Sequence, residues 1–270
     1  MPAEPVNSAL TPDIAMSTPT TTLAVRPIGA GVLTLSILLF LVAANAPYAW
    51  LIANFGYDDI LREPTTVVLR RFRDGGSALV LAWLAFAVGA MLFIPVALGM
   101  RRLLVAHGID DHGAAILGVG SAIAQATGLL RWVLVIPSLA EAYTAPESTA
   151  ATRAASVIAF DAVHRLAGMV IGEMLGQLLL AGWTALTVLH LTRARLVPRW
   201  LLLFGAVVPP LWLIGQTELL HDVVPAVSAV EVTPAAFMLW EAWLAIVATV
   251  ILTRALRAGR SGPSEDGCNS

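Results

Sequence analysis

The chain has 270 residues, of which 58% are hydrophobic and only 13% are charged. A soluble domain could not cover so apolar a composition with a polar surface, so the surplus must face lipid. The net charge is −2 and the basic residues are dispersed, which excludes a nucleic-acid-binding surface. All 16 basic residues are arginine and the only cysteine is Cys268, which excludes a lysine Schiff base and an internal disulfide.

Residues 1–26 are rich in Pro, Thr, Ala and Ser and predict a disordered cytoplasmic tail. A membrane-crossing helix needs roughly 20 mostly apolar residues. Within residues 27–257, such segments lie at about 28–52, 77–99, 114–138, 162–191, 199–220 and 235–256. The sequence therefore predicts an all-α fold, a polytopic bundle of six transmembrane helices, with a second disordered tail over residues 258–270. Ala44-Asn45-Ala46 also resembles a signal-peptidase site, and cleavage there would leave five spans.

The arginines outside the spans predict the orientation of the bundle. With the N-terminus inside, the cytoplasmic side receives Arg26, Arg101, Arg102, Arg193, Arg195, Arg199, Arg254, Arg257 and Arg260. The opposite side receives Arg62, Arg70, Arg71, Arg73 and Arg153 from its loops. Because cytoplasmic loops carry the excess of basic residues, we expect both chain ends in the cytoplasm and the protein in the inner (cytoplasmic) cell membrane.

Two external stretches predict short interfacial helices. Pro64 followed by apolar residues between Val67 and Phe72 is typical of a helix start. A second such helix is expected from Pro146 to Phe160. The fourth span is longer than one crossing requires, so its first turns, around His164, are expected to protrude among the lipid head groups.

Polar side chains within the spans are the informative positions, because they are costly in lipid and usually face the bundle interior. At 1.5 Å per residue, five of the six spans place such a group in the external half. The candidate binding residues are Asn45, Arg131, Trp132, Glu173, Gln177, Gln216, Trp240 and Glu241. Their common depth predicts one shared polar pocket. In the alternative interpretation, Arg131 and a glutamate form only a structural ion pair between helices.

Gly168, Gly172 and Gly176 recur every four residues and predict a small-residue stripe for close helix packing. No zinc-helix, phosphate-loop or nucleophile-elbow motif is present in the sequence. His164 and Glu173 are nine residues apart on one helix and face opposite ways, so they make a poor metal pair. We expect neither a metal site nor a cofactor.

The chain resembles the bacterial DUF4386 family of multi-pass membrane proteins over most of residues 28–256. The likeness lies in Leu69-Arg70-Arg71-Phe72-Arg73, Leu130-Arg131-Trp132, His164-Arg165-Leu166-Ala167-Gly168, Leu196-Val197-Pro198-Arg199-Trp200 and Leu239-Trp240-Glu241-Ala242. The resemblance implies about six helices and no established activity.

These observations favour a protein that binds, senses or conducts a small polar or amphipathic molecule, or a proton, at the external polar pocket. The first alternative is an intramembrane enzyme that acts on a lipid or isoprenoid, with Glu173 or Glu241 as acid or base. The second is an accessory subunit that binds a membrane partner, or a second copy of the chain, through the glycine stripe. The expected partners are the lipid bilayer and a small-molecule or lipid ligand, without nucleic acid.

Overall fold

The computed structural model of the chain describes residues 27–221 and 223–260. The predicted tail over residues 1–26 lies outside the described residues. So does most of the predicted tail over residues 258–270, but residues 258–260 belong to the last helix.

Every regular element in the described part of the chain is helical. In chain order the elements are α1 (Pro27–Phe55), η1 (Asp59–Arg62), α2 (Thr65–Met91), α3 (Phe93–Val105), α4 (His112–Leu134), α5 (Ile136–Thr144), α6 (Ala150–Val163), η2 (His164–Leu175), α7 (Gly176–Arg193), α8 (Arg199–His221) and α9 (Thr233–Arg260). Six continuous helical stretches are long and apolar enough to cross a membrane. The predicted six-span helical bundle is confirmed.

Local sequence signals set several helix boundaries. Asp111 begins α4 by accepting a hydrogen bond from the backbone N–H of Gly113 at 2.7 Å. Thr149 begins α6 in the same way, accepting from the N–H of Thr152 at 3.1 Å. Gly108 has φ +78° in the turn between α3 and α4, a conformation that glycine adopts without strain.

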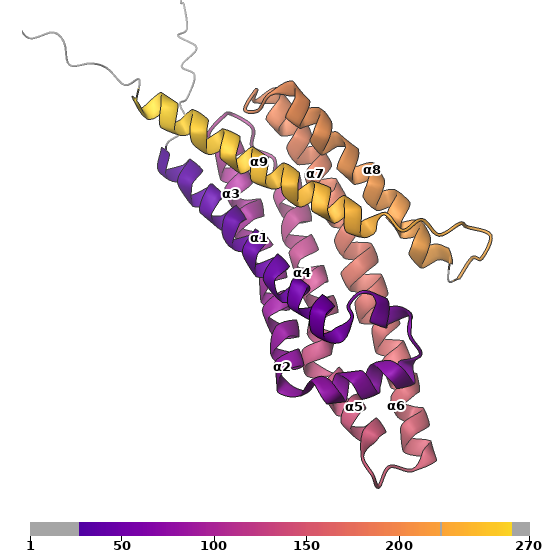
Figure 1. Ribbon diagram of the computed structural model, residues 1–270. Coiled ribbons are helices and arrows are strands. Elements are labelled where there is room, and N and C mark those ends of the chain that lie inside the picture. The colour runs from indigo at the N-terminus through magenta and orange to yellow at the C-terminus, as the bar shows by residue number, and fades with distance from the viewer. Residues whose placement is uncertain (1–26, 222, 261–270) are drawn as a thin grey trace, which may run out of the picture.

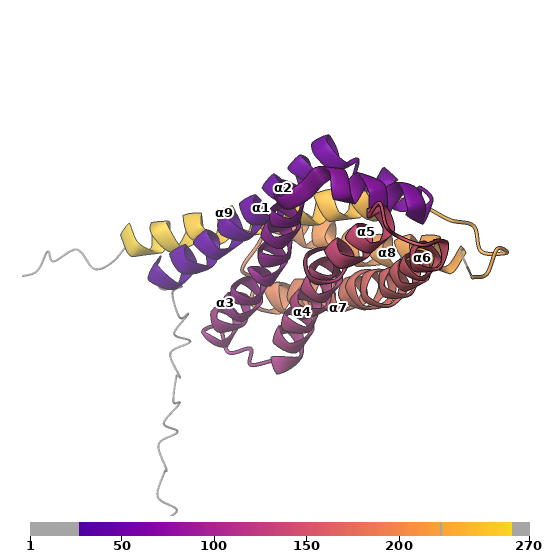
Figure 2. The same ribbon diagram turned by 90° about the horizontal axis from the view of Figure 1, so that it is seen from below.

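The six spans form a closed ring in which each packs against its neighbours in the chain (Figures 1 and 2). The last helix, α9, completes the ring by packing against α1 and α8. The start of α1 and the end of α9 lie at the same end of the bundle, which we call the terminal end (Figure 1). We call the other end the α5–α6 end.

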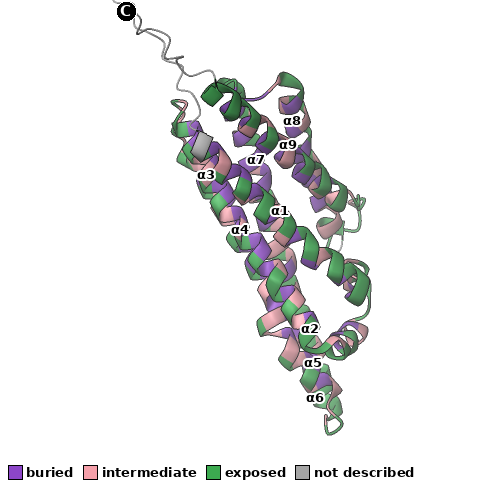
Figure 3. Ribbon diagram, turned by 60° about the vertical axis from the view of Figure 1, so that its left-hand side comes forward, coloured by how far each residue is buried: buried purple, intermediate pink, exposed green. Residues whose placement is uncertain are grey.

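Three spans are much longer than a bilayer requires. The stretch formed by α6, η2 and α7 has 44 residues, the stretch formed by α2 and α3 has 41, and the stretch formed by α4 and α5 has 33. A helix of 44 residues is about 66 Å long, roughly twice the hydrocarbon thickness. The excess lies at the α5–α6 end, where α6 continues the line of η2 and α7 (Figure 1) and carries mostly exposed residues (Figure 3).

The first half of α2 crosses the bundle, and the second half runs along it (Figure 1). The change of direction occurs at Gly76, whose φ of +56° is not helical. Val68, Leu69 and Phe72 in the crossing half are buried against the protein. Its apolar face therefore packs on neighbouring helices.

The buried side chains form two separate cores. The first fills the ring towards the terminal end and contains Trp183, Trp240 and Trp243. The second fills the α5–α6 end and contains Trp83 and Trp132. The six-helix ring and the group of short helices at its end thus each have apolar packing of their own.

Packing between α1 and α2 depends on Gly89. A Cβ at this position would overlap the backbone carbonyl of Ala43 in α1. Backbone cannot rotate away as a flexible side chain can, so we expect Gly89→Ala to force the two helices apart. The free energy of unfolding should fall by about 1–3 kcal/mol, measured by thermal or chemical denaturation in detergent.

The matched control is Gly31→Ala, because no atom lies within 4 Å of a Cβ built at Gly31 in α1. This substitution should cause no loss of stability. Equal melting temperatures for the two variants would contradict the proposed close contact at Gly89.

Candidate functional site

Arg131, near the end of α4, is a charged residue that is almost fully buried, with an exposed fraction of only 8%. Its Nη1 donates a hydrogen bond to the carbonyl oxygen of Gly128, and its Nη2 lies 3.3 Å from Nδ1 of His164. Its Cζ lies 5.1 Å from the ring centroid of Trp132, which is a cation–π contact. No carboxylate in the described part of the chain lies within 4 Å of Arg131, so its charge is not neutralised by an ion pair there.

Glycines in the fourth span make room for the Arg131 side chain. A Cβ on Gly168 would lie 2.7 Å from Cζ of Arg131. A Cβ on Gly172 would lie 2.9 Å from Cα of Gly128, and a Cβ on Gly176 would lie 2.7 Å from Cγ of Gln125. The three glycines of the stripe therefore all face α4.

Gly168 and Gly172 belong to η2, a π-helical segment. Such segments in α-helices are frequently found at functional sites, because they change the direction of side chains locally. Here η2 places His164 beside Arg131.

Aromatic rings pack against the two residues that contact Arg131, Trp132 and His164. Trp132 stacks on Trp83 with centroids 4.8 Å apart and planes at 11°. Phe72 also stacks on Trp132, with ring centroids 5.6 Å apart and planes at 25°. Phe160 stacks on His164 at 5.5 Å and 8°. We call Trp83, Trp132, Phe72 and Phe160 the aromatic wall.

Three buried N–H donors at this site have no acceptor in the described structure. They are Nε of Arg131, Nε1 of Trp132 and Nε1 of Trp83. A buried donor without an acceptor costs about 1–3 kcal/mol, so such groups are uncommon. These three unpaired donors belong to Arg131 and to the two tryptophans stacked beside it.

Glu173 lies on the same π-helical segment and is half-buried. It forms no hydrogen bond or ion pair of 4 Å or less in the described structure, but it interacts electrostatically with Arg131. Tyr57, in the loop after α1, is a second electrostatic neighbour of Arg131. Burial, followed by the charge of Asp58, raises the pKa of Tyr57, so this phenol stays protonated.

The other predicted site residues form two further groups. Asn45 of α1 donates from Nδ2 to both carboxylate oxygens of Glu241 in α9, at 2.8 and 2.9 Å. Gln216 of α8 donates to Oε1 of Gln177 in α7 at 2.6 Å. No hydrogen bond or ion pair among the described residues joins these pairs to each other or to Arg131. The polar positions therefore form three contacts between different helices, and not one directly connected cluster.

The two candidate tryptophans lie in different cores. Trp132 belongs to the aromatic wall beside Arg131. Trp240 belongs to the core of the ring, where its Nε1 donates to Oγ1 of Thr184 at 3.0 Å.

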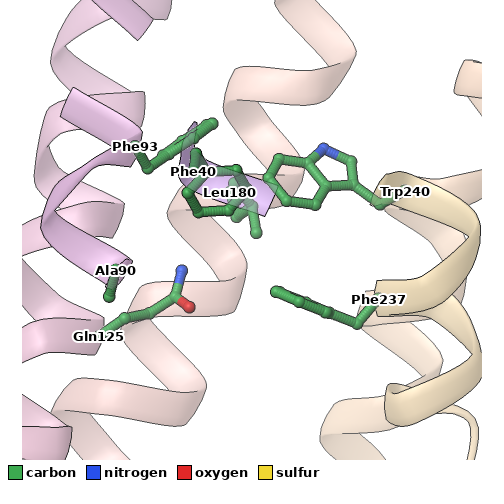
Figure 4. A pocket seen from close by; sticks show the side chains of 7 residues that line it. All are labelled: Phe40, Ala90, Phe93, Gln125, Leu180, Phe237 and Trp240. Atoms are coloured by element: carbon green, nitrogen blue, oxygen red, sulfur yellow. The ribbon is translucent and has the colours of Figure 1, made fainter. Parts of the chain in front are cut away.

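Trp240 also lines a small cavity with Gln125, Phe93 and Phe237 (Figure 4). The cavity volume is about 10 Å³, enough for roughly one water molecule. The amide of Gln125 lies among apolar side chains in Figure 4 and donates to Oγ of Ser121 at 2.8 Å.

Sequence reasoning did not assign His164 and Tyr57 to the site. His164 was expected among the head groups, but it stacks on Phe160 and contacts Arg131. The predicted spans placed Arg131 seven residues from the end at 138 but His164 only two residues from the start at 162, so they gave no signal for this contact. In the structure the two helical stretches extend to Thr144 and begin at Ala150, which brings His164 and Arg131 to similar distances from the span ends. Tyr57 lies in a loop, and the sequence carries no signal for its approach to Arg131.

Charged residues in the loop after α1 link it to the rest of the α5–α6 end. Asp58 accepts a hydrogen bond from Oη of Tyr48 at 3.0 Å. Arg62 pairs with Glu218 of α8 at 2.8 Å and with Glu231 at 3.5 Å. The hydrogen bond with Glu218 raises the pKa of Arg62, which is therefore always charged.

Comparison with known proteins assigns the chain to a family. The family described as a domain of unknown function, DUF4386, matches residues 31–247. The protein belongs to this family. No curated protein and no solved structure shows significant similarity to it. The expected family membership is confirmed, and the membrane-spanning helices agree with it.

The contact between Asn45 and Glu241 can be tested by a double-mutant cycle. Asn45→Leu removes the donor and leaves a carboxylate that is only 9% exposed without its partner. We expect a loss of about 1–3 kcal/mol in the free energy of unfolding. Adding Glu241→Leu should recover part of this loss, because removing both partners leaves no buried polar group unsatisfied.

As a control, Ser36→Ala in α1 should change little, because Ser36 is only half-buried and its side chain bonds only to the carbonyl of Val32 in its own helix. Additive losses for the Asn45 and Glu241 substitutions would show that the two side chains do not interact.

The raised pKa of Asp58 predicts that the stability of the protein depends on pH. Burial raises its pKa above the ordinary value of 3.8, although the hydrogen bond from Tyr48 acts in the opposite direction. The folded state therefore binds this proton more tightly than the unfolded state. The resulting stability is fully present below pH 3.8 and is lost as the pH rises through the folded-state pKa.

Asp58→Asn should remove this part of the decline in melting temperature with rising pH. Asp59→Asn should keep most of it, because burial of Asp58 is the largest cause of the raised pKa and the side chain of Asp59 is 98% exposed. Melting curves between about pH 4 and pH 8 provide the measurement. An unchanged pH profile for Asp58→Asn would refute the assignment.

Proposed function

We propose that this protein binds an amphipathic molecule with an anionic head group at Arg131. The observation that carries the proposal is the buried guanidinium group of Arg131, which has no carboxylate within ion-pair distance in the described structure. A buried charge is costly unless it is paired. A guanidinium group matches carboxylate and phosphate oxygens, with two parallel N–H donors.

The surroundings of Arg131 support a ligand with both polar and apolar parts. The unsatisfied Nε1 groups of Trp83 and Trp132 can donate to further oxygens of a head group. The aromatic wall is buried and apolar, so the hydrocarbon part of such a ligand would have to displace or repack these rings. Glu173 can accept a hydrogen bond from a hydroxyl or amine on the same ligand.

The arrangement of arginines supports an orientation with both chain ends in the cytoplasm and a location in the inner (cytoplasmic) cell membrane. The described arginines at the terminal end are Arg101, Arg102, Arg193, Arg195, Arg199, Arg254, Arg257 and Arg260. Fewer lie at the α5–α6 end, and a cytoplasmic excess is the rule. The α5–α6 end then faces outward.

Arg131 would then lie near the outer boundary of the hydrocarbon. Helix α4 begins at His112 at the terminal end, and Arg131 lies near its other end. The distance between these two residues along the helix is about 30 Å, close to the thickness of the hydrocarbon. A ligand could reach this depth from the outer leaflet or from the external solution. The small cavity near Gln125 holds about one water, which argues against passage of a solute through the ring at that level.

The proposal is tested by ligand-induced thermal stabilisation of the purified protein in mild detergent. The panel contains fatty acids, isoprenyl phosphates and lysophospholipids, with uncharged alcohols of the same chain length. We expect at least one anionic amphiphile to raise the melting temperature saturably, and the matching alcohol to have a much smaller effect. Arg131→Met should abolish the shift, and Arg131→Lys should retain part of it, because lysine keeps the charge without the paired donors.

Arg153→Gln is the matched control, because it removes an exposed arginine from the same end of the bundle. It should leave the ligand-induced shift unchanged. The proposal fails if no anionic amphiphile stabilises the parent protein. It also fails if folded Arg131→Met retains the full shift.

A further inference from the structure

A second candidate site lies on the surface, where the last turn of α1 meets the kink in α2. An open cleft of about 440 Å³ runs between residues 52–56 and residues 71–75. Gly56, one of the residues that line the cleft, has φ +74°, and a Cβ there would lie 3.5 Å from Nη1 of Arg71. The guanidinium group of Arg71 therefore lies over the backbone at the end of α1.

The cleft presents two opposite charges. Arg71 and Asp74 both line it, and both are exposed. They are three residues apart on one helix, a spacing at which such residues commonly pair. Yet neither forms a hydrogen bond or an ion pair of 4 Å or less in the described structure. The cation and the anion therefore do not pair with each other in the described structure, and both are accessible.

The cleft also lies at a boundary between apolar and polar surface. Ile52, on its α1 side, is 47% exposed near the end of a membrane-spanning helix. Trp50, which is 36% exposed in the preceding turn, is a residue type that favours the membrane interface. On the α2 side, Arg70, Arg71 and Arg73 are exposed along the half of α2 that crosses the bundle. Lipid head groups occupy this level of a bilayer.

We propose that this cleft binds the head group of a zwitterionic phospholipid with a primary amine. The phosphate would contact Arg71, and the ammonium group would contact Asp74. Arginine matches phosphate oxygens, and a carboxylate accepts hydrogen bonds from an N–H donor. A trimethylammonium group has no N–H to donate, and an anionic head group without an amine would meet the charge of Asp74. The site therefore favours phosphatidylethanolamine over phosphatidylcholine and phosphatidylglycerol.

Native mass spectrometry of the purified full chain, titrated with each of these three lipids at equal chain length, tests the inference. We expect several-fold tighter binding of phosphatidylethanolamine. Arg71→Gln should weaken binding of all three lipids, because it removes the phosphate contact. Asp74→Asn should remove the preference and strengthen phosphatidylglycerol binding. Arg73→Gln, which changes an exposed arginine outside the cleft, should leave the preference intact.

Equal affinity of the parent for the three lipids would overturn the inference, as would a preference that survives Asp74→Asn. Both substituted side chains are exposed, so the variants should fold, which melting curves verify. The inference does not depend on the site at Arg131. Arg131→Met should keep the lipid preference, so failure at one site is distinguishable from failure at the other.

Discussion

A guanidinium group buried between two helices needs space and hydrogen-bond acceptors, and the contact between α4 and η2 supplies the space and part of the acceptors. The space comes from Gly168, since a Cβ there would collide with Arg131. One acceptor is the carbonyl of Gly128, and a nitrogen of His164 is the other polar contact. Gly128 and Gly172 bring the two backbones together just beside this point. Packing and polar chemistry therefore depend on the same helix contact.

The same contact joins the two cores of the molecule. Towards the terminal end, the ring of spans is filled by aliphatic side chains and tryptophans, and its polar contacts are pairs such as Asn45 with Glu241. Such pairs satisfy polar groups between helices and fix their relative positions. Towards the α5–α6 end, the helices exceed the length of a bilayer and enclose the aromatic wall. Arg131 lies at the transition from one to the other.

Arg131 and Arg71, two arginines of the α5–α6 end, differ in their exposure, and this difference separates their proposed roles. Arg131 is almost fully buried, and its neighbours contribute unsatisfied donors. A ligand at the proposed site would have to give up its water, so shape and hydrogen bonding would decide which molecule binds. Arg71 is exposed and lies in an open cleft beside Asp74. A surface site of this kind distinguishes ligands mainly by the arrangement of their charges.

The amino-acid sequence by itself determined the six spans, because apolar length and composition are local properties that a bilayer selects directly. It also indicated which glycines could face a neighbouring helix, since a spacing of four residues places them on one side. Only the tertiary structure decided which polar side chains form hydrogen bonds with each other. Glu241 bonds to Asn45, and Gln216 to Gln177, because the rotation and height of each helix are set by packing against its neighbours. For the same reason hydropathy does not reveal that His164 and Tyr57 lie near Arg131. A helix fixes spacing along its own axis, but its position relative to another helix depends on side chains distant in the sequence.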